Sequence, residues 1–224
     1  MEEELDRQVR AYVATGVAAL LGLDEDALRG RVAPLRRALL AQPTTDDDDA
    51  AAAAAAARDA DARGDHVPVV LVPDLPAAVL NAVVPALRHG GRRGLSVVPD
   101  DELVTYRPVE GVVGSEGDHL LLGVDTGGPF HGTPPEAALA AVRAAGRTPL
   151  TVAEGLALVV VRPDVLRPNR CFSLMGSRRG DQRVPAVWLS AGRPKLGWCW
   201  DRNPHDWLGA AHAARRLQVA DRDA

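Results

Sequence analysis

Residues 43–66 constrain what this chain can fold into more than any other segment, because they contain no large apolar side chain. The segment runs from Pro43 through four aspartates and eight alanines into alternating Asp, Ala and Arg. Alanine favours helix, yet a helix without a bulky apolar face gains little free energy from packing. We therefore expect an acidic, alanine-rich linker at 43–66, between an N-terminal helical segment, 1–42, and a main domain, 67–217.

The rest of the chain has the composition of a globular protein. Of the 224 residues, 46% are hydrophobic, which is enough for one sizeable core or two small ones. No run approaches the eighteen or more apolar residues of a membrane span, and the N-terminus is acidic where a leader would be basic. The two cysteines, Cys171 and Cys199, are too few for a disulfide framework and lack zinc-ligand spacing. The sequence thus predicts a cytoplasmic protein with reduced thiols and with no metal, cofactor or membrane contact.

Periodicity and turn residues divide the remaining chain into helices and strands. Helical spacing covers residues 2–21 and 24–42. In the main domain we expect strands at 68–73, 95–98, 119–125, 172–175, 184–190 and 195–200, helices at 75–88, 133–145, 151–163 and 204–217, and then a tail at 218–224. These elements predict an α+β fold: an N-terminal helical pair, a mixed or antiparallel sheet flanked by helices, and a C-terminal Trp-rich hairpin followed by a helix.

Three of the expected helices have a recognisable start. Thr133 and Glu136 have the spacing of a capping box, and so do Thr151 and Glu154. In such a box the threonine and the glutamate each accept a backbone N–H at the helix N-terminus. Asn203, followed by proline, supplies the cap and first turn of the last helix.

All four tryptophans fall within twenty residues, from Trp188 to Trp207, in a chain with only four other aromatic residues. Two strands joined by a four-residue turn would place Val187 opposite Trp198 on one face of a hairpin. On the other face, Trp188 would lie across Gly197. We expect at least two of the four indoles to pack in a core.

Charge is distributed unevenly along the chain. Residues 1–66 hold fourteen acidic and eight basic residues, whereas residues 162–202 hold nine basic and three acidic ones, within a net charge of −4. Arginines in a glycine-flanked loop can bind phosphate or carboxylate groups, and indoles beside them can wall a pocket. We therefore predict a binding module for a small anionic molecule or an acidic peptide. Its ligand-binding residues are expected to be Arg178, Arg179, Asp181, Arg183, Lys195, Trp188, Trp200 and Asn203.

Several strings in the main domain carry a resemblance to a known family. They are Val124-Asp-Thr-Gly127, Gly146-Arg-Thr-Pro-Leu-Thr151 with Glu154-Gly155, Gly176-Ser-Arg178 with Gly180-Asp181 and Arg183-Val-Pro-Ala186, Pro194-Lys-Leu-Gly-Trp-Cys-Trp200, and Asn203-Pro-His205 with Trp207-Leu-Gly209. Over roughly residues 65–215 the chain resembles an actinobacterial family of uncharacterised proteins, a domain of unknown function. The resemblance implies a shared fold and a shared site, assigns no chemistry, and leaves out the N-terminal helices and the linker.

Two other classes of function are compatible with the same residues. In a cysteine-dependent enzyme, Cys199 would be the nucleophile and His205 the base, with Lys195 on the same strand face lowering the thiol pKa. In a structural or assembly protein, the Trp-rich hairpin and the N-terminal helices would form the interface of a homodimer. Nucleic acid is a disfavoured partner, because the whole chain is acidic and no groove-reading motif appears.

Overall fold

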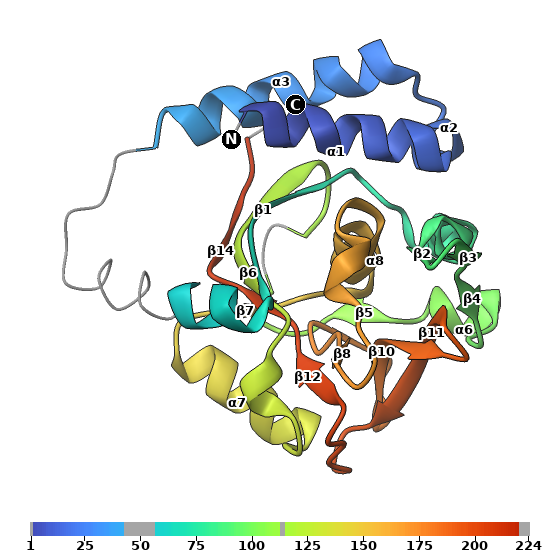
Figure 1. Ribbon diagram of the computed structural model, residues 1–224, viewed down its shortest axis with the longest axis vertical. Helices are drawn as coiled ribbons and strands as arrows, with labels where there is room; N and C mark the ends of the chain where they lie inside the picture. The colour runs from blue at the N-terminus through green and yellow to red at the C-terminus, as the bar shows by residue number, and fades with distance from the viewer. Residues whose placement is uncertain (1, 43–56, 113–114, 220–224) are drawn as a thin grey trace.

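Two five-stranded sheets and a layer of helices surround one buried helix in the computed structural model, which describes residues 2–42, 57–112 and 115–219 (Figure 1). The helices are α1 (Glu2–Thr15), α2 (Val17–Leu20), α3 (Glu25–Leu40), α5 (Leu80–Val83), α6 (Asp100–Leu103), α7 (Pro135–Ala144) and α8 (Val152–Val161), with 3-10 turns η1 (Ala77–Val79), η2 (Val84–Ala86), η3 (Gly128–Phe130) and η4 (Pro163–Val165). The strands are β1 (His66–Val72), β2 (Arg88–His89), β3 (Arg92–Arg93), β4 (Leu95–Ser96), β5 (Arg107–Pro108), β6 (His119–Asp125), β7 (Thr148–Pro149), β8 (Cys171–Ser173), β9 (Ser177–Arg178), β10 (Arg183–Ser190), β11 (Arg193–Trp200), β12 (Leu208–Ala210), β13 (His212–Ala213) and β14 (Arg215–Leu217). The α+β class is confirmed.

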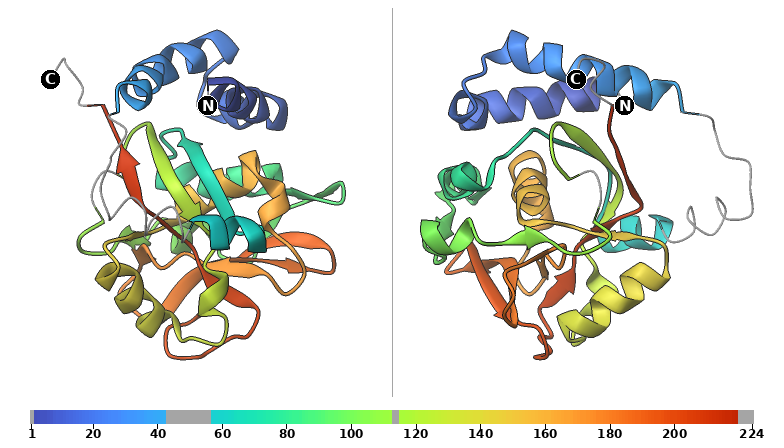
Figure 2. Two further views of the ribbon diagram at one scale, coloured as in Figure 1. Left: turned by 60° about the vertical axis from the view of Figure 1, so that its left-hand side comes forward. Right: turned by 180° about the vertical axis from the view of Figure 1, so that it is seen from behind.

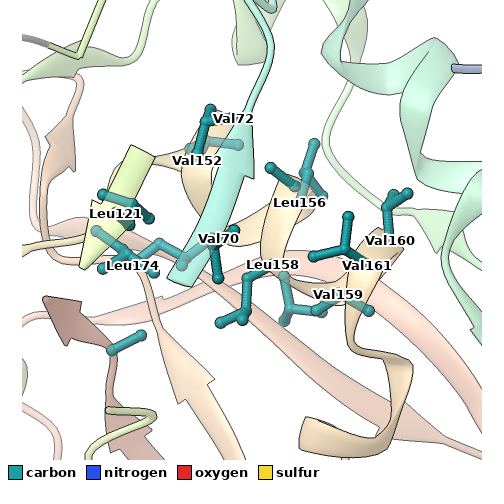
Figure 3. Close-up of a cluster of buried hydrophobic side chains, with 14 of the residues drawn as sticks. Val70, Val72, Leu121, Val152, Leu156, Leu158, Val159, Val160, Val161 and Leu174 are labelled. Atoms are coloured by element: carbon teal, nitrogen blue, oxygen red, sulfur yellow. The ribbon is translucent and has the colours of Figure 1, made fainter. Parts of the chain in front are cut away.

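Helix α8 is the centre of the core. Its sequence is apolar on every side except at Glu154, and such a helix is stable only when it is enclosed. Nine of its ten residues are buried, and Figure 3 shows their side chains packed among Val70 and Val72 of β1, Leu121 of β6, and Leu174. The predicted capping box at its start and the predicted end before Pro163 are both confirmed.

The first sheet has the order β1-β6-β13-β7, and β14 also pairs with β6. All of these pairs are antiparallel. The strands predicted at 68–73 and 119–125 are confirmed as β1 and β6. Strand β1 lies at the edge of the sheet, so one row of its backbone groups needs partners from elsewhere.

Helix α1 supplies those partners. The Gln8 side chain donates to the Val69 carbonyl at 2.8 Å and accepts the Leu71 N–H at 2.6 Å. The Tyr12 hydroxyl donates to the Leu71 carbonyl at 2.5 Å. The N-terminal helices therefore form a layer over β1 and α8, on the side of the molecule opposite α7 and the β10–β11 hairpin (Figures 1 and 2). The predicted pair of helices is confirmed, with a break at Gly16, whose φ is +82°.

The second sheet has the order β12-β8-β10-β11-β4. Its hairpin turns over two residues, Ala191 and Gly192, at φ +52° and +70°, where we expected four. Two-residue turns of this hand match the twist of the strands. Val187 therefore lies opposite Leu196, and the predicted pairing with Trp198 is wrong by two residues. Because two residues is one full period of a strand, every side chain still lies on the predicted face.

The helix predicted at 204–217 is wrong. The segment forms β12, β13 and β14, so the cap expected from Asn203 does not occur. Gly209 shows the physical reason: a Cβ there would come within 2.5 Å of the Thr126 carbonyl oxygen and 2.7 Å of the Gly127 carbonyl oxygen. Glycine is required for close backbone packing here, and this requirement overrides the helical preference of an alanine-rich segment.

Two smaller predictions are also corrected. Thr133 caps no helix, because α7 begins at Pro135 with Pro134 as its cap, and Glu136 instead pairs with Arg202. The helix expected at 75–88 is the broken series η1, α5 and η2, since a proline at residue 85 interrupts it.

The last part of the expected linker is structured. Residues 43–56 lie outside the described residues, but residues 57–63 are helical and Ala60 is buried. Asp65 is also buried, and Arg167 donates to its carboxylate at 2.7 Å. The Arg167 contact attaches residues 57–65 to the segment between η4 and β8. Across the described ranges, no helix has both the length and the apolarity needed to cross a bilayer.

Candidate functional site

A cavity of about 540 Å³ lies where three segments meet: residues 74–80, residues 104–108 and the N-terminus of α8. Its apolar wall includes Leu75, Pro76, Ala77, Ala78, Leu80 and Val104. Its polar residues include Thr151 and Ser177 beside α8, Tyr106 and Arg107, and the acidic Asp74 and Glu116.

The α8 end of the cavity offers hydrogen-bond donors. In the capping box the Thr151 N–H donates to the Glu154 carboxylate at 2.6 Å, and the Glu154 N–H donates to the Thr151 hydroxyl at 3.4 Å. The Val152 N–H donates to Ser177 Oγ at 3.1 Å. No acceptor within the described residues takes the Ala153 N–H, which lies between them in the first turn. Such N–H groups carry the positive end of the helix dipole and suit an anion.

Tyr106 forms part of the cavity wall and has an unsatisfied polar atom. The residue is only 6% exposed, and its hydroxyl has no hydrogen-bond partner among the described residues. Burial, together with the negative charges of Glu102 and Asp181, raises the pKa of Tyr106 to about 12, so the hydroxyl keeps its proton. An unpaired buried hydroxyl costs about 1–3 kcal/mol of stability. The Tyr106 hydroxyl is therefore a buried, protonated donor on a residue of the cavity wall.

The short strands β5 and β9 bring Arg107 and Ser177 to the same end of the cavity. They pair antiparallel, with Pro108 opposite Ser177. One nitrogen of the exposed Arg107 guanidinium donates to the carbonyls of Val104 and Tyr106. A guanidinium has five N–H donors, so others remain for a ligand at the rim.

Two of the arginines predicted to bind a ligand converge on a carboxylate of the protein. Nitrogens of Arg179 and Arg183 lie 2.8 and 2.9 Å from Oε1 of Glu102, and Asp181 lies 3.3 and 3.7 Å from the same two side chains. The cluster adjoins the cavity, because the Arg179 guanidinium lies 5.9 Å from the centre of the Tyr106 ring. With two cations and two carboxylates it is neutral, and it supports the Tyr106 wall from outside the cavity lining.

The predicted catalytic residues are not joined by a hydrogen bond in the described part of the chain. Cys199 is 7% exposed, and burial raises the pKa of its thiol to about 12. The predicted ligand-binding residue Arg178 is close to this thiol and donates to Asp201 at 3.0 Å. The ring of His205 packs against Trp207, with ring centres 5.4 Å apart. A thiol that stays protonated at neutral pH is a poor nucleophile.

The predicted pairing of Trp188 with Gly197 is also wrong by two residues, but the Trp188 indole still covers Gly197. A Cβ on Gly197 would be 2.3 Å from the indole, so only glycine fits beneath it. Lys195 is the cross-strand partner of Trp188, and its Nζ lies 6.0 Å from the centre of the ring. These residues lie outside the lining of the cavity.

The opposite face of the hairpin carries the other aromatic pair. The rings of Trp198 and Trp200 have centres 4.9 Å apart, and Trp200 is 44% exposed. The Arg183 guanidinium lies 4.5 Å from the centre of the Trp198 ring. Asn203 is exposed, and its N–H closes a turn onto the Trp200 carbonyl. The predicted ligand-binding residues are therefore spread over both faces of the hairpin, and none of them lines the cavity at α8.

The cavity residues that the sequence analysis missed are Tyr106, Arg107 and Ser177. Only the capping box at Thr151 marks this place in the sequence, because it identifies the start of a buried helix. Tyr106 and Ser177 lie about 45 residues before and 26 residues after that box, and no local pattern shows that both meet it.

A second, larger cavity of about 880 Å³ lies beside α3, between Arg31, Asp118 and Gln218. Its Arg31 is already bound to Asp118 by two hydrogen bonds of 2.6 and 2.8 Å. None of the unpartnered buried polar atoms found in the described residues belongs to its lining. We therefore take the smaller cavity as the candidate site. Throughout residues 2–42, 57–112 and 115–219, no three His, Cys, Asp or Glu side chains are grouped to hold a metal ion.

The fold and the cavity define a class: an α+β protein in which the capped end of a buried helix opens onto a ligand-sized hollow. The chain belongs to a family of unknown function, DUF5701, whose family model matches residues 11–219. The resemblance to a domain of unknown function is thereby confirmed, and the match extends to the N-terminal helices and the linker, which we had placed outside it. No curated protein and no solved structure matches the chain.

Proposed function

We propose that this protein binds a small anionic molecule in the cavity at the N-terminus of α8. One observation carries the proposal: two hydrogen-bond donors without partners in the described residues, the buried Tyr106 hydroxyl and the Ala153 N–H, belong to residues that line the same cavity. Ser177 and Arg107 add a hydroxyl and a cation beside them. An unsatisfied N–H at a helix N-terminus suits a carboxylate or a phosphate.

The size and lining of the cavity favour a small molecule over an acidic peptide. Small-molecule sites measure about 300–1,000 Å³ and combine apolar walls with a few converging polar groups. The wall from Leu75 to Leu80 is of this kind. The class of ligand predicted from the sequence is therefore kept, and its site moves from the Trp-rich hairpin to the end of α8.

Two substitutions and one matched control test the proposal. Binding of a panel of small carboxylates and phosphates to the full chain is measured by calorimetry. Arg107→Gln should weaken binding about tenfold, the effect of losing one charge-assisted hydrogen bond. Arg202→Gln, on an arginine that is exposed and outside the cavity, should leave affinity unchanged.

Tyr106→Phe separates binding from stability. It should weaken binding and also raise the free energy of unfolding of the unliganded protein by about 1 kcal/mol, because it removes a buried hydroxyl that has no partner. Loss of stability in this variant, or a panel without a single binder, would count against the proposal.

The two alternative functions have less support. A cysteine-dependent enzyme would need Cys199 as a thiolate, and burial opposes that form. A homodimer built on the Trp-rich hairpin stays a prediction, as do an actinobacterial origin and a cytoplasmic location. Light scattering at high protein concentration tests the dimer.

A further inference from the structure

Two acidic residues lie at the rim of the cavity. Asp74 and Glu116 both line the cavity and both are exposed. Within the described residues neither side chain forms an ion pair, whereas the neighbouring Asp118 is bound by Arg31 at 2.6 Å. Glu102, whose partner Arg179 lies beside the Tyr106 ring, also holds arginines. Asp74 and Glu116 thus outnumber Arg107, the cation of the lining, and leave the charged residues of the lining with a net negative charge.

These carboxylates conflict with a ligand that carries negative charge alone. Like charges a few ångströms apart repel, by roughly 1 kcal/mol even with the dielectric constant of water between them. The donors at α8 attract an anion and the rim at Asp74 and Glu116 repels it. A ligand that also carries a positively charged group facing Asp74 and Glu116 would be attracted by these carboxylates.

From this arrangement we infer that the cavity is built for a zwitterion of the amino-acid type. Its carboxylate lies at the Ala153 N–H, its ammonium group faces Asp74 and Glu116, and an apolar side chain packs on Leu75 and Leu80. The inference rests on the proposed function and narrows it from small anions to molecules with both charges. An ammonium group supplies three N–H donors, which is enough to reach both rim carboxylates.

The test compares compounds that differ by one charged group. Calorimetry on the full chain uses leucine and phenylalanine, their des-amino counterparts 4-methylpentanoate and 3-phenylpropanoate, and the matching amines 3-methylbutylamine and 2-phenylethylamine. We expect at least one amino acid to bind about tenfold tighter than its des-amino counterpart, with both amines weaker still.

Variants of Asp74 and Glu116 test whether these carboxylates cause the preference for amino acids over des-amino acids. The double variant Asp74→Asn with Glu116→Gln should lower amino-acid affinity to that of the des-amino acid and leave the des-amino acid at least as tightly bound. Glu110→Gln is the matched control, because Glu110 is exposed and outside the lining. Circular dichroism checks that each variant is folded.

The outcomes separate this inference from the proposed function. If the des-amino acids bind as tightly as the amino acids, the zwitterion is overturned and anion binding stands. If none of the six compounds binds, the zwitterion is overturned, and the panel of carboxylates and phosphates decides the proposed function. If the amino acids are preferred equally by the wild type and the double variant, the rim carboxylates have no part in recognition and the inference fails.

Discussion

Glu154 is the residue on which the start of α8 depends. Its carboxylate is fully buried and accepts hydrogen bonds from Arg216 at 2.5 and 2.8 Å, from His119 Nε2 at 3.1 Å, and from the Thr151 N–H. Arg216 also donates to the Pro149 carbonyl. One acid thus connects α8 with β6, β7 and β14, and its partners satisfy the charge that burial would otherwise make costly.

Removing that charge should destabilise the protein strongly. Glu154→Gln leaves the Arg216 guanidinium buried without its counter-ion, and we expect it to lower the free energy of unfolding by about 3–5 kcal/mol in urea titrations. Glu136→Gln is the control, because the Glu136–Arg202 pair is exposed and contributes little. Equal decreases in the free energy of unfolding for the two variants would show that the buried cluster around Glu154 contributes no more to stability than an exposed ion pair.

The same residue makes stability depend on pH. Burial raises the pKa of Glu154, but the hydrogen bonds from His119 and Arg216 outweigh it and lower the pKa to about 2, against 4.5 for an unperturbed glutamate. A folded-state pKa below the unfolded value gives stability that is present above pH 4.5 and is lost as pH falls toward 2. Wild-type unfolding free energy should therefore decline across this interval more steeply than that of Glu154→Gln.

Both cysteines should resist alkylation in the folded protein. Burial raises the pKa of Cys171 as well as that of Cys199, and only a thiolate reacts quickly. Iodoacetamide at pH 8 should leave the native chain unlabelled by mass spectrometry and label both residues in urea. Rapid labelling of Cys199 without denaturant would restore the enzyme hypothesis.

At the scale of elements, helix α8 and its neighbours are held by a close contact at Gly155. A Cβ on Gly155 would lie 2.2 Å from a methyl carbon of Leu174, in the centre of the core. In helix α3, by contrast, a Cβ on Gly30 would meet no atom within 4 Å.

These two glycines allow a matched comparison. Gly30→Ala should stabilise the protein by about 0.5–1 kcal/mol, because alanine is the better helix former. Gly155→Ala should destabilise it by about 1–3 kcal/mol. The added methyl group clashes in the core, and this costs more free energy than the higher helix propensity of alanine gains. Urea titrations measure both, and a stabilising Gly155→Ala would contradict the packing seen around α8.

Elements also show where local patterns stop being informative. The capping box at Thr151 predicts α8 correctly, because its hydrogen bonds join residues three apart. The alanine-rich segment 208–217 has an equally helical composition but forms strands. Its small residues serve contacts with Gly127 and with β8, which lie far away in the sequence.

At the scale of the whole molecule, the N-terminal helices and the sheets share one set of buried side chains. Leu5, Val9 and Tyr12 of α1 belong to the same hydrophobic cluster as the residues of α8 and β10. The side chains of Gln8 and Tyr12 also form hydrogen bonds with backbone groups at the edge of β1.

We therefore expect one cooperative unfolding transition. All four tryptophans lie between residues 188 and 207, so their fluorescence reports on the C-terminal part, whereas the far-ultraviolet dichroism includes the N-terminal helices. The two signals should change at the same urea concentration. An earlier loss of the helical signal would show that residues 1–42 fold as a separate unit.

The sequence by itself determined the features that depend on neighbours along the chain. These are the helical pair at the N-terminus, the strands β1, β6 and β10, the cap of α8, and the face on which each hairpin side chain lies. Periodicity and capping act over two to four residues, so they can be read directly from the chain.

Only the tertiary structure decided the site and the C-terminal strands. The meeting of Tyr106, Ala153 and Ser177 in one cavity depends on packing between segments dozens of residues apart. The same packing brings Arg179 and Arg183 into ion pairs with Glu102, a carboxylate about 80 residues earlier in the chain. A local pattern of charge shows which residues can bind an anion, but it cannot show which of them the fold has already neutralised.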